Sequence, residues 1–356
     1  MGTEESAPMN YLANILEQPQ VLRAILKTYH ESPLWDELRQ QCRQQLDPTI
    51  VLTGMGASYN ALLPTYLSLL QAGFPALRVE TSELLYYVPA LWQRPCCLVV
   101  VSQSGESIEI RRLLEQIQDQ AEQGLPTPLL ISVTNQADNH LARHSTVNLC
   151  TQAGAEVGVA TKTYTSTLLL LNLMRRTILG DLQDKHYQQW YEIADAQAAF
   201  CADWEAQLAP IQDQLRVKTH WALVGRGPAI ASAHSGALIF KEATRVPAEG
   251  FSGGQFRHGP FELLSPNLGV ILFTTGKTAE LSQRLAQDIL KAGTVPICIG
   301  NTTIPDAIQV PLPVVEECLQ PCLEILVIQL LAAQLAALKG VTPGIFRWGT
   351  KVVQQE

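Results

Sequence analysis

Four hydroxyl and amide side chains are crowded into one short turn that follows a buried apolar run. Ser102, Gln103, Ser104 and Ser107 lie within six residues, and a helical pattern begins directly after them. The start of a helix offers free backbone N–H groups and a partial positive charge, and both favour a phosphate. The hydroxyl and amide groups add neutral hydrogen-bond donors. An ordinary helix cap needs only one serine, so the turn predicts a phosphate site.

A second turn, Gly54-Met55-Gly56-Ala57-Ser58, follows another apolar run. If the two preceding strands are neighbours in one sheet, the hydroxyl of Ser58 reaches the same phosphate. The turn lacks the GK[ST] ending of a P-loop and the third glycine of a dinucleotide fingerprint. A plain strand-to-helix turn remains the alternative for this segment.

Three titratable residues in the second half of the chain are candidates for proton transfer. Glu242 ends an apolar helical segment, and His258 follows sixteen residues later in a glycine-framed stretch. A carboxylate and an imidazole suit acid–base work near neutral pH. Lys351 lies in a partly apolar C-terminal segment and could act as a general base or form a Schiff base. The alternative for Glu242 is an exposed helix charge, that for His258 a turn residue, and that for Lys351 a solvated side chain. A further acid, Glu156, could be a buried structural residue.

Short apolar runs predict the strands that position these groups. They are separated by helical segments of ten or more residues, and this alternation favours parallel sheets with helices on both faces. The predicted strands cover residues 50–52, 97–101, 129–133, 221–224, 270–273 and 296–299.

The chain also repeats itself. Gly54 and Gly225 each follow a strand, and Gly105 and Gly276 each follow a later one, with 171 residues between the members of either pair. This order and spacing indicate a duplicated α/β domain. The second copy has Phe-Thr-Thr in place of Ser-Gln-Ser at residues 273–275, so we expect one phosphate site per chain.

Five segments follow from these signals. We expect an N-terminal helical segment, a phosphate-binding α/β domain, a helical connector rich in Gln, Asp and Ala, a second α/β domain and a C-terminal tail. Their approximate ranges are 1–48, 49–178, 179–215, 216–340 and 341–356.

Composition narrows the class of protein further. The 356 residues are 47% hydrophobic and 16% charged, which favours a folded core over disorder. The net charge of −8 disfavours non-specific nucleic-acid binding. The eight cysteines include no zinc-type pattern and are expected to be reduced thiols in a cytoplasmic protein. The apolar run 325–338 is interpreted as a buried core helix, and we expect neither a membrane segment nor a targeting peptide.

Taken together, the motifs resemble the sugar-isomerase (SIS) superfamily in its double-SIS form, and within it the isomerase half of glucosamine-6-phosphate synthase. The resemblance implies two tandem SIS domains, each with a five-stranded parallel sheet flanked by helices in a flavodoxin-like three-layer sandwich. The matching segments are 15–19, 56–60, 80–83, 102–107, 153–160, 225–227, 241–242, 248–249 and 257–260, together with Lys351.

The resemblance also implies roles for single residues. Glu242 would move a proton between C1 and C2 of a sugar, His258 would open the ring from the partner subunit of a homodimer, and Lys351 would form a Schiff base with the open ketose. Val159 and Ala160 would line the sugar with their backbone. No metal and no organic cofactor is implied. The residues implied to bind phosphate are Ser58, Ser102, Gln103, Ser104 and Ser107.

Several departures limit what the resemblance implies. The synthase has a lysine at the position of Ile239 and a histidine at the position of Pro247. It also has a glutaminase domain with an N-terminal cysteine, whereas residue 2 of this chain is Gly2 and no glutaminase domain precedes the first SIS domain in this sequence. We therefore expect no glutamine-dependent amino transfer by this chain unaided. The preferred hypothesis is an aldose–ketose isomerase or isomerising deaminase for a hexose 6-phosphate or amino-sugar 6-phosphate. A deglycase for sugar-phosphate–amine conjugates and a non-catalytic sugar-phosphate sensor are the alternatives.

Overall fold

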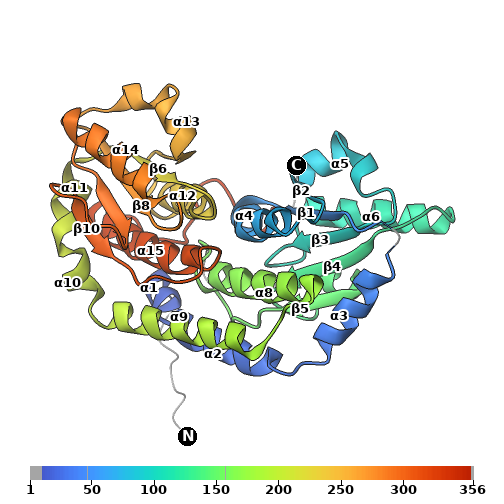
Figure 1. Ribbon diagram of the computed structural model, residues 1–356. Coiled ribbons are helices and arrows are strands. Elements are labelled where there is room, and N and C mark those ends of the chain that lie inside the picture. The colour runs from blue at the N-terminus through green and yellow to red at the C-terminus, as the bar shows by residue number, and fades with distance from the viewer. Residues whose placement is uncertain (1–9, 46, 157, 354–356) are drawn as a thin grey trace, which may run out of the picture.

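Two α/β units, each built on a five-stranded sheet, make up the computed structural model, which describes residues 10–45, 47–156 and 158–353 (Figure 1). The first sheet has the order β2-β1-β3-β4-β5 and the second the order β7-β6-β8-β9-β10, and every strand pair is parallel. This is the flavodoxin-type order. The same order in both sheets confirms the duplicated α/β fold.

The strands of the first sheet are β1 (Ile50–Gly54), β2 (Ala76–Glu80), β3 (Cys97–Val101), β4 (Leu129–Thr134) and β5 (Val147–Cys150). Those of the second are β6 (His220–Gly225), β7 (Ala248–Ser252), β8 (Leu268–Thr274), β9 (Ile297–Gly300) and β10 (Ile308–Pro311). All six predicted strands are present. The sequence did not predict β2, β5, β7 and β10, which are the edge strands of the two sheets.

Helices cover both faces of each sheet. Those before and within the first unit are α1 (Tyr11–Leu16), α2 (Gln18–Tyr29), α3 (Leu34–Arg43), α4 (Gly56–Gln71), α5 (Thr81–Tyr86), α6 (Ile108–Glu122), α7 (His140–His144) and α8 (Lys162–Leu179). The connector contains α9 (Asp184–Ala202), α10 (Trp204–Leu208) and α11 (Gln212–Val217). The second unit adds α12 (Ala229–Ile239), α13 (Gly253–Arg257), α14 (Ala279–Lys291) and α15 (Gln320–Leu338).

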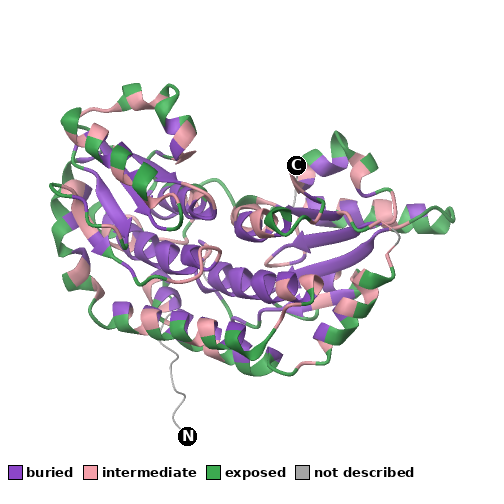
Figure 2. Cartoon of the chain, in the orientation of Figure 1, coloured by how far each residue is buried: buried purple, intermediate pink, exposed green. Residues whose placement is uncertain are grey.

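The hydrophobic core is continuous between the two units. One cluster runs from the inner face of the first sheet through α8 and α15 to the second sheet, and smaller clusters fill the outer face of each sheet. In Figure 2 the central helices α8 and α15 are almost entirely buried. Helix α15 is long and apolar enough to cross a membrane, but 78% of its 18-residue window is buried within the protein, as expected of a core helix.

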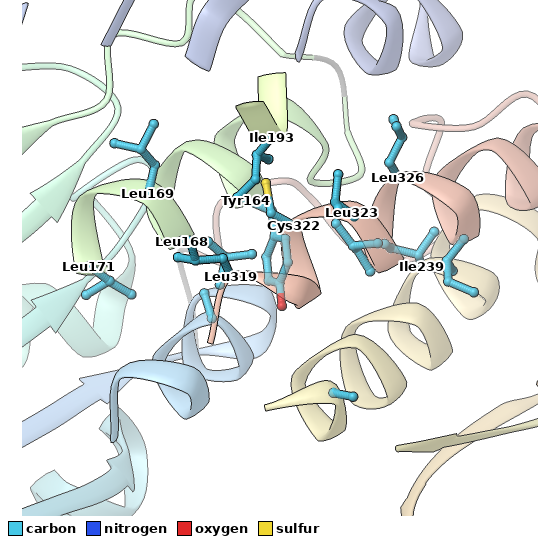
Figure 3. Close-up of a cluster of buried hydrophobic side chains, with 14 of the residues drawn as sticks. Tyr164, Leu168, Leu169, Leu171, Ile193, Ile239, Leu319, Cys322, Leu323 and Leu326 are labelled. Atoms are coloured by element: carbon cyan, nitrogen blue, oxygen red, sulfur yellow. The ribbon is translucent and has the colours of Figure 1, made fainter. Parts of the chain in front are cut away.

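Figure 3 shows part of the shared core, where side chains of α8 and α15 meet. Tyr164 and Leu168 lie beside Leu319, Cys322 and Leu323. Burying a leucine of this kind stabilises the fold by about 1.5–3 kcal/mol. The two units are therefore held together by core packing, which fixes the position of α4 and α12 beside the site described below.

Candidate functional site

Two neighbouring strands bring the two polar turns of the first unit together. β1 and β3 pair in parallel with Gly54 opposite Val101, so the turn 55–58 and the turn 102–107 leave the same edge of the sheet side by side. This is the arrangement in which Ser58 was expected to join the serine turn. Helix α4 begins at Gly56, within the first of these turns, and α6 begins at Ile108, directly after the second. We call the two turns the first cradle.

The serine turn organises itself and still leaves a hydroxyl unused. The amide of Gly105 donates to the Oγ of Ser102 at 3.1 Å, and that of Glu106 donates to the Oγ of Ser104 at 3.2 Å. Gly105 has a φ of +66°, which glycine adopts without strain. Ser107 is the N-cap residue of α6, yet its side chain makes no capping hydrogen bond. The turn is thus more than a simple cap, because its N-cap hydroxyl remains available to a ligand.

A cavity of about 470 Å³ opens against this cradle and extends to the second unit and the C-terminal segment. Most of the residues proposed from the sequence line it. They are Ser58, Ser102, Gln103, Ser104, Ser107, Ala160, Glu242 and Lys351.

Glu242 enters the cavity from a distorted helix end. α12 continues into a π-helical turn, Phe240–Thr244, which ends at Arg245 in the left-handed conformation with a φ of 59°. Single π-helical turns occur frequently at functional sites. Burial raises the pKa of Glu242 to about 7, against the opposing effect of Lys241 and Lys351. A carboxyl group with this pKa both accepts and donates a proton near neutral pH.

Lys351 is held in a defined position and is not freely solvated. Its Nζ donates to the backbone carbonyl of Glu156 at 2.6 Å and to the carboxylate at 3.2 Å, and its side chain is 27% exposed. The fully buried Glu156 carboxylate also accepts hydrogen bonds of 2.7–3.1 Å from the amides and hydroxyls of Thr161 and Thr163. Glu156 is therefore both the buried structural acid considered from the sequence and the partner of the candidate lysine.

The C-terminal segment 341–353, called the tail below, is attached at both ends. Near its start, Arg245 Nη2 donates to the carbonyl of Ile345 at 3.1 Å. Near its end, the amide of Ile108 in α6 donates to the carbonyl of Val353 at 3.1 Å. These contacts join the helix end that carries Glu242, the tail and the first cradle into one wall around the cavity.

A second, more polar cavity of about 740 Å³ lies on the other side of this wall and shares Gln103, Ser104 and Lys351 with the first. Arg111 and Glu106 form an ion pair on its lining. A wider groove of about 1010 Å³ lies away from these side chains, near α1, α10 and the end of α15. Its lining is mostly apolar and does not include the candidate site residues.

Some candidate residues do not line the 470 Å³ cavity. His258, at the end of α13, is exposed and is not part of its lining. Val159 is buried with only 1% of its surface exposed, and its neighbour Ala160 lines the cavity in its place. Ile239, where the resembled synthase has a lysine, packs into the apolar cluster of Figure 3. Pro247 precedes the edge strand β7 and also lies outside the cavity lining.

The part of the chain that the structure describes contains no cluster of side chains suited to bind a metal ion. No group of three or more His, Cys, Asp or Glu side chains is arranged there to hold an ion. The eight cysteines are all free thiols, and five of them are buried. Burial raises the pKa of Cys96 to about 12 and that of Cys298 to about 12, which disfavours the reactive thiolate.

Comparisons with known proteins identify the family and the fold of the chain. The SIS-domain family model matches residues 46–175 and 214–339. Glutamine–fructose-6-phosphate aminotransferase (isomerizing) of Pyrococcus horikoshii is 31% identical over 347 residues, which cover 93% of this chain and 55% of the relative. The chain thus spans about half the length of the curated relatives it matches.

Two solved structures show the same fold. The C-terminal domain of glucosamine-fructose-6-phosphate aminotransferase from Francisella tularensis superposes with a TM-score of 0.79 at 21% identity, covering 96% of this chain and 98% of that domain. Glucosamine-6-phosphate deaminase from Thermotoga maritima gives a TM-score of 0.76 at 18% identity, covering 97% and 99% of the two chains.

Proposed function

The chain belongs to the SIS-domain family of phosphosugar isomerases, and from this premise we propose that it is an aldose–ketose isomerase or isomerising deaminase. Its substrate would be a hexose 6-phosphate or an amino-sugar 6-phosphate, of the fructose 6-phosphate or glucosamine 6-phosphate type. The observation that carries the proposal is the 470 Å³ cavity, which places a serine-rich cradle, Glu242 and Lys351 around one space. The matched relative acts on fructose 6-phosphate by its name, which supports the substrate class.

The first cradle would hold the phosphate. The hydroxyls of Ser58, Ser104 and Ser107 and the N-terminal amides of α4 and α6 supply neutral donors to the phosphate oxygens. Each hydrogen bond to a charged oxygen contributes about 1.5–3 kcal/mol. Binding at this end fixes the sugar so that its carbon chain extends toward Glu242 and Lys351.

Glu242 would carry the proton between C1 and C2. Its raised pKa of about 7 allows the carboxylate to take a proton from one carbon and the acid to return it to the next. The intermediate would be an enediol for a ketose or an enamine for an amino sugar. In the direction of amino-sugar breakdown, water then releases ammonia from the imine formed after the proton shift.

Lys351 would act at the carbonyl carbon. The Glu156 carbonyl and carboxylate hold its ammonium group at the cavity wall. From there it can polarise the substrate carbonyl oxygen or, after losing a proton, attack the carbonyl carbon to form a Schiff base with release of water. His258 is exposed on its own chain, so ring opening by this histidine requires a homodimer in which it reaches the partner's cavity.

Turnover of defined phosphosugars tests this proposal. Purified protein is assayed for interconversion of glucose 6-phosphate and fructose 6-phosphate, and for ammonia release from glucosamine 6-phosphate. Turnover of at least one, lost in Glu242→Gln, is expected. Thermal stabilisation by these sugars without any turnover would instead favour a sugar-phosphate sensor. If the sugars cause neither turnover nor stabilisation, the proposal is overturned.

The 740 Å³ cavity favours a second candidate, a deglycase for a sugar-phosphate–amine conjugate. This cavity adjoins Lys351 and presents an ion pair, Arg111 with Glu106, that complements the carboxylate and ammonium of an amino acid. A conjugate of fructose 6-phosphate with an amino acid therefore belongs in the substrate panel. Cleavage of the conjugate that is faster than turnover of the free sugars, and weaker in Arg111→Gln, would select the deglycase.

A further inference from the structure

The second α/β unit contains two turns that match the first cradle in position. We propose that these turns, 226–228 after β6 and 275–278 after β8, form a second anion cradle, and that the carboxylate of Glu317 occupies it as an internal ligand. The proposal concerns anion binding alone and is independent of the reaction proposed above. It accounts for a single phosphate site in a chain built from two copies of the same fold.

The backbone of the two cradles is closely similar. β6 and β8 are parallel neighbours, as β1 and β3 are in the first sheet, with a register that differs by one residue: Leu272 lies opposite Val224, whereas its counterpart Val101 lies opposite Gly54. Gly227 has a φ of +55° where Gly56 has +51°, and Gly276 has +72° where Gly105 has +66°. The duplication has thus preserved the left-handed glycine in each turn, although the serine side chains differ.

Glu317 fills the space between the two turns of the second cradle. Its Oε1 accepts a hydrogen bond of 3.2 Å from the amide of Lys277, at the turn that leads into α14. A Cβ atom added to Gly227 would lie 3.7 Å from the same oxygen, and one added to Gly276 would lie only 2.9 Å from the Cγ of Glu317. The carboxylate therefore lies against both glycine turns. In the first unit the neutral side-chain amide of Asn139 lies against Gly105, the counterpart of Gly276, so a charged group has replaced a neutral one.

A second acid closes the inner side of this cradle. Glu324 of α15 accepts hydrogen bonds from Thr275 at 2.6 Å and from Ser232 at 2.5 Å. By the repeat spacing, Thr275 corresponds to Ser104 of the first cradle. Its hydroxyl is thus directed to an internal acid, while the backbone amide of Lys277 is directed to Glu317.

The corresponding acid of the first unit lines the same cavity as its cradle but accepts its hydrogen bonds from other donors. Glu156 lies six residues after the last strand of the first sheet, and Glu317 lies six residues after the last strand of the second. Glu156 turns toward the start of α8, where Thr161 and Thr163 supply four hydrogen bonds. The same loop position therefore leaves one cradle open and closes the other.

The charges around the second cradle also suit an anion. Lys277 is exposed at its rim, and Arg226 belongs to its first turn. The Nε of Arg226 is buried, and among the described residues it has no hydrogen-bond partner. The guanidinium of Arg226 lies against Gly253, so the positive charge that the Glu317 carboxylate meets is that of the backbone amides at the start of α14. With that carboxylate removed, a phosphate monoester or inorganic phosphate is the ligand class that fits.

Stoichiometry of phosphate binding tests the proposal. Inorganic phosphate is titrated into the full chain by calorimetry and by amide NMR, for wild type, Glu317→Ala and the matched control Glu280→Gln. Glu280 is an exposed acid in the first turn of α14. We expect one phosphate-binding site per chain in wild type and in the control, and two sites in Glu317→Ala. Phosphate should shift the NMR signal of the Lys277 amide only in Glu317→Ala.

A background that lacks the first cradle isolates the second. In Ser104→Ala/Ser107→Ala we expect no phosphate site, and addition of Glu317→Ala should create one. A folded Glu317→Ala protein with no new site in either background would overturn the proposal. If wild type binds no phosphate at all, that result would count against the proposed function but not against this proposal. The shift of the Lys277 amide in Glu317→Ala would still report binding at the second cradle.

Discussion

Lys351 lies 2.6 Å from the backbone carbonyl oxygen of Glu156 and 3.2 Å from its carboxylate, although 195 residues separate them in sequence. The contact joins the tail to the loop before α8, on the wall shared by both polar cavities. The tail is also attached through Ile345 and Val353. These hydrogen bonds on both sides of Lys351 fix its position, although it lies in the C-terminal segment. A fixed position at the cavity wall supports the role proposed for Lys351 at a substrate carbonyl.

Replacing Lys351 with methionine should remove catalysis while leaving substrate binding largely intact. Positioned acid–base groups contribute about 10²–10⁴-fold, so we expect kcat to fall within that range with little change in KM. Steady-state kinetics on the substrate found active provides the measurement. Lys351→Arg is the matched control: it keeps the charge but forms no Schiff base, so retained activity in the arginine variant would limit the lysine to electrostatic stabilisation.

Ser107 offers the clearest test of the first cradle because its hydroxyl makes no capping bond. Ser107→Ala should therefore leave the free energy of unfolding nearly unchanged and weaken phosphosugar binding. Loss of one hydrogen bond to a charged oxygen, about 1.5–3 kcal/mol, corresponds to roughly 10- to 100-fold in Kd. Calorimetry measures the change, and Ser68→Ala on α4, outside the cavity lining, serves as control. Equal affinities for the two variants would contradict the assignment.

The sequence predicted the central strands and the serine turn because both depend on local features. β1, β3, β4 and β8 are continuous apolar runs, fully buried in the sheets. β2 and β10 are half exposed and carry polar residues, so no apolar run marks them. Their pairing depends on the neighbouring strand, and a single sequence does not report it.

The sequence predicted only part of the candidate site, because some of its contacts join residues that are far apart in the chain. The sequence marked Glu242 and Lys351, but it gave no sign that Glu156 contacts the lysine, since that contact requires the folded tail. Likewise, nothing local to Glu317 indicates that it reaches the turn at Lys277. Long-range polar contacts such as these follow from topology, whereas turn chemistry follows from neighbouring residues.

Burial of Glu242 should be visible in the pH dependence of both activity and stability. Where Glu242 acts as the base, kcat/KM should rise with pH and level off above a midpoint of about 7. Glu242→Gln should abolish turnover over the whole pH range, whereas Glu249→Gln, an exposed acid on β7, should retain this rise with pH. A pH profile that is flat between pH 5 and 8 would exclude Glu242 as the titrating base.

The same raised pKa fixes the sign of the stability effect. Below the ordinary glutamate pKa of 4.5 the carboxyl is protonated in both the folded and the unfolded chain, so the raised pKa does not change stability there. As the pH rises through 4.5 toward 7, the unfolded chain ionises first, and the folded state is destabilised by on the order of 3 kcal/mol. Glu242→Gln should therefore unfold at the same denaturant concentration as wild type at pH 4 and at a higher one at pH 8.

Mixing two inactive variants tests whether His258 acts across a dimer. His258 is exposed and does not line the cavity of its own chain, so His258→Asn and Glu242→Gln should each be inactive alone. In a mixed dimer, one of the two cavities would combine an intact Glu242 with an intact His258 from the partner. Unfolding and refolding the two variants together should thus restore part of the wild-type activity. Full inactivity of a mixture shown to contain heterodimers would exclude action of His258 across the interface, and activity of His258→Asn alone would place the histidine outside the reaction.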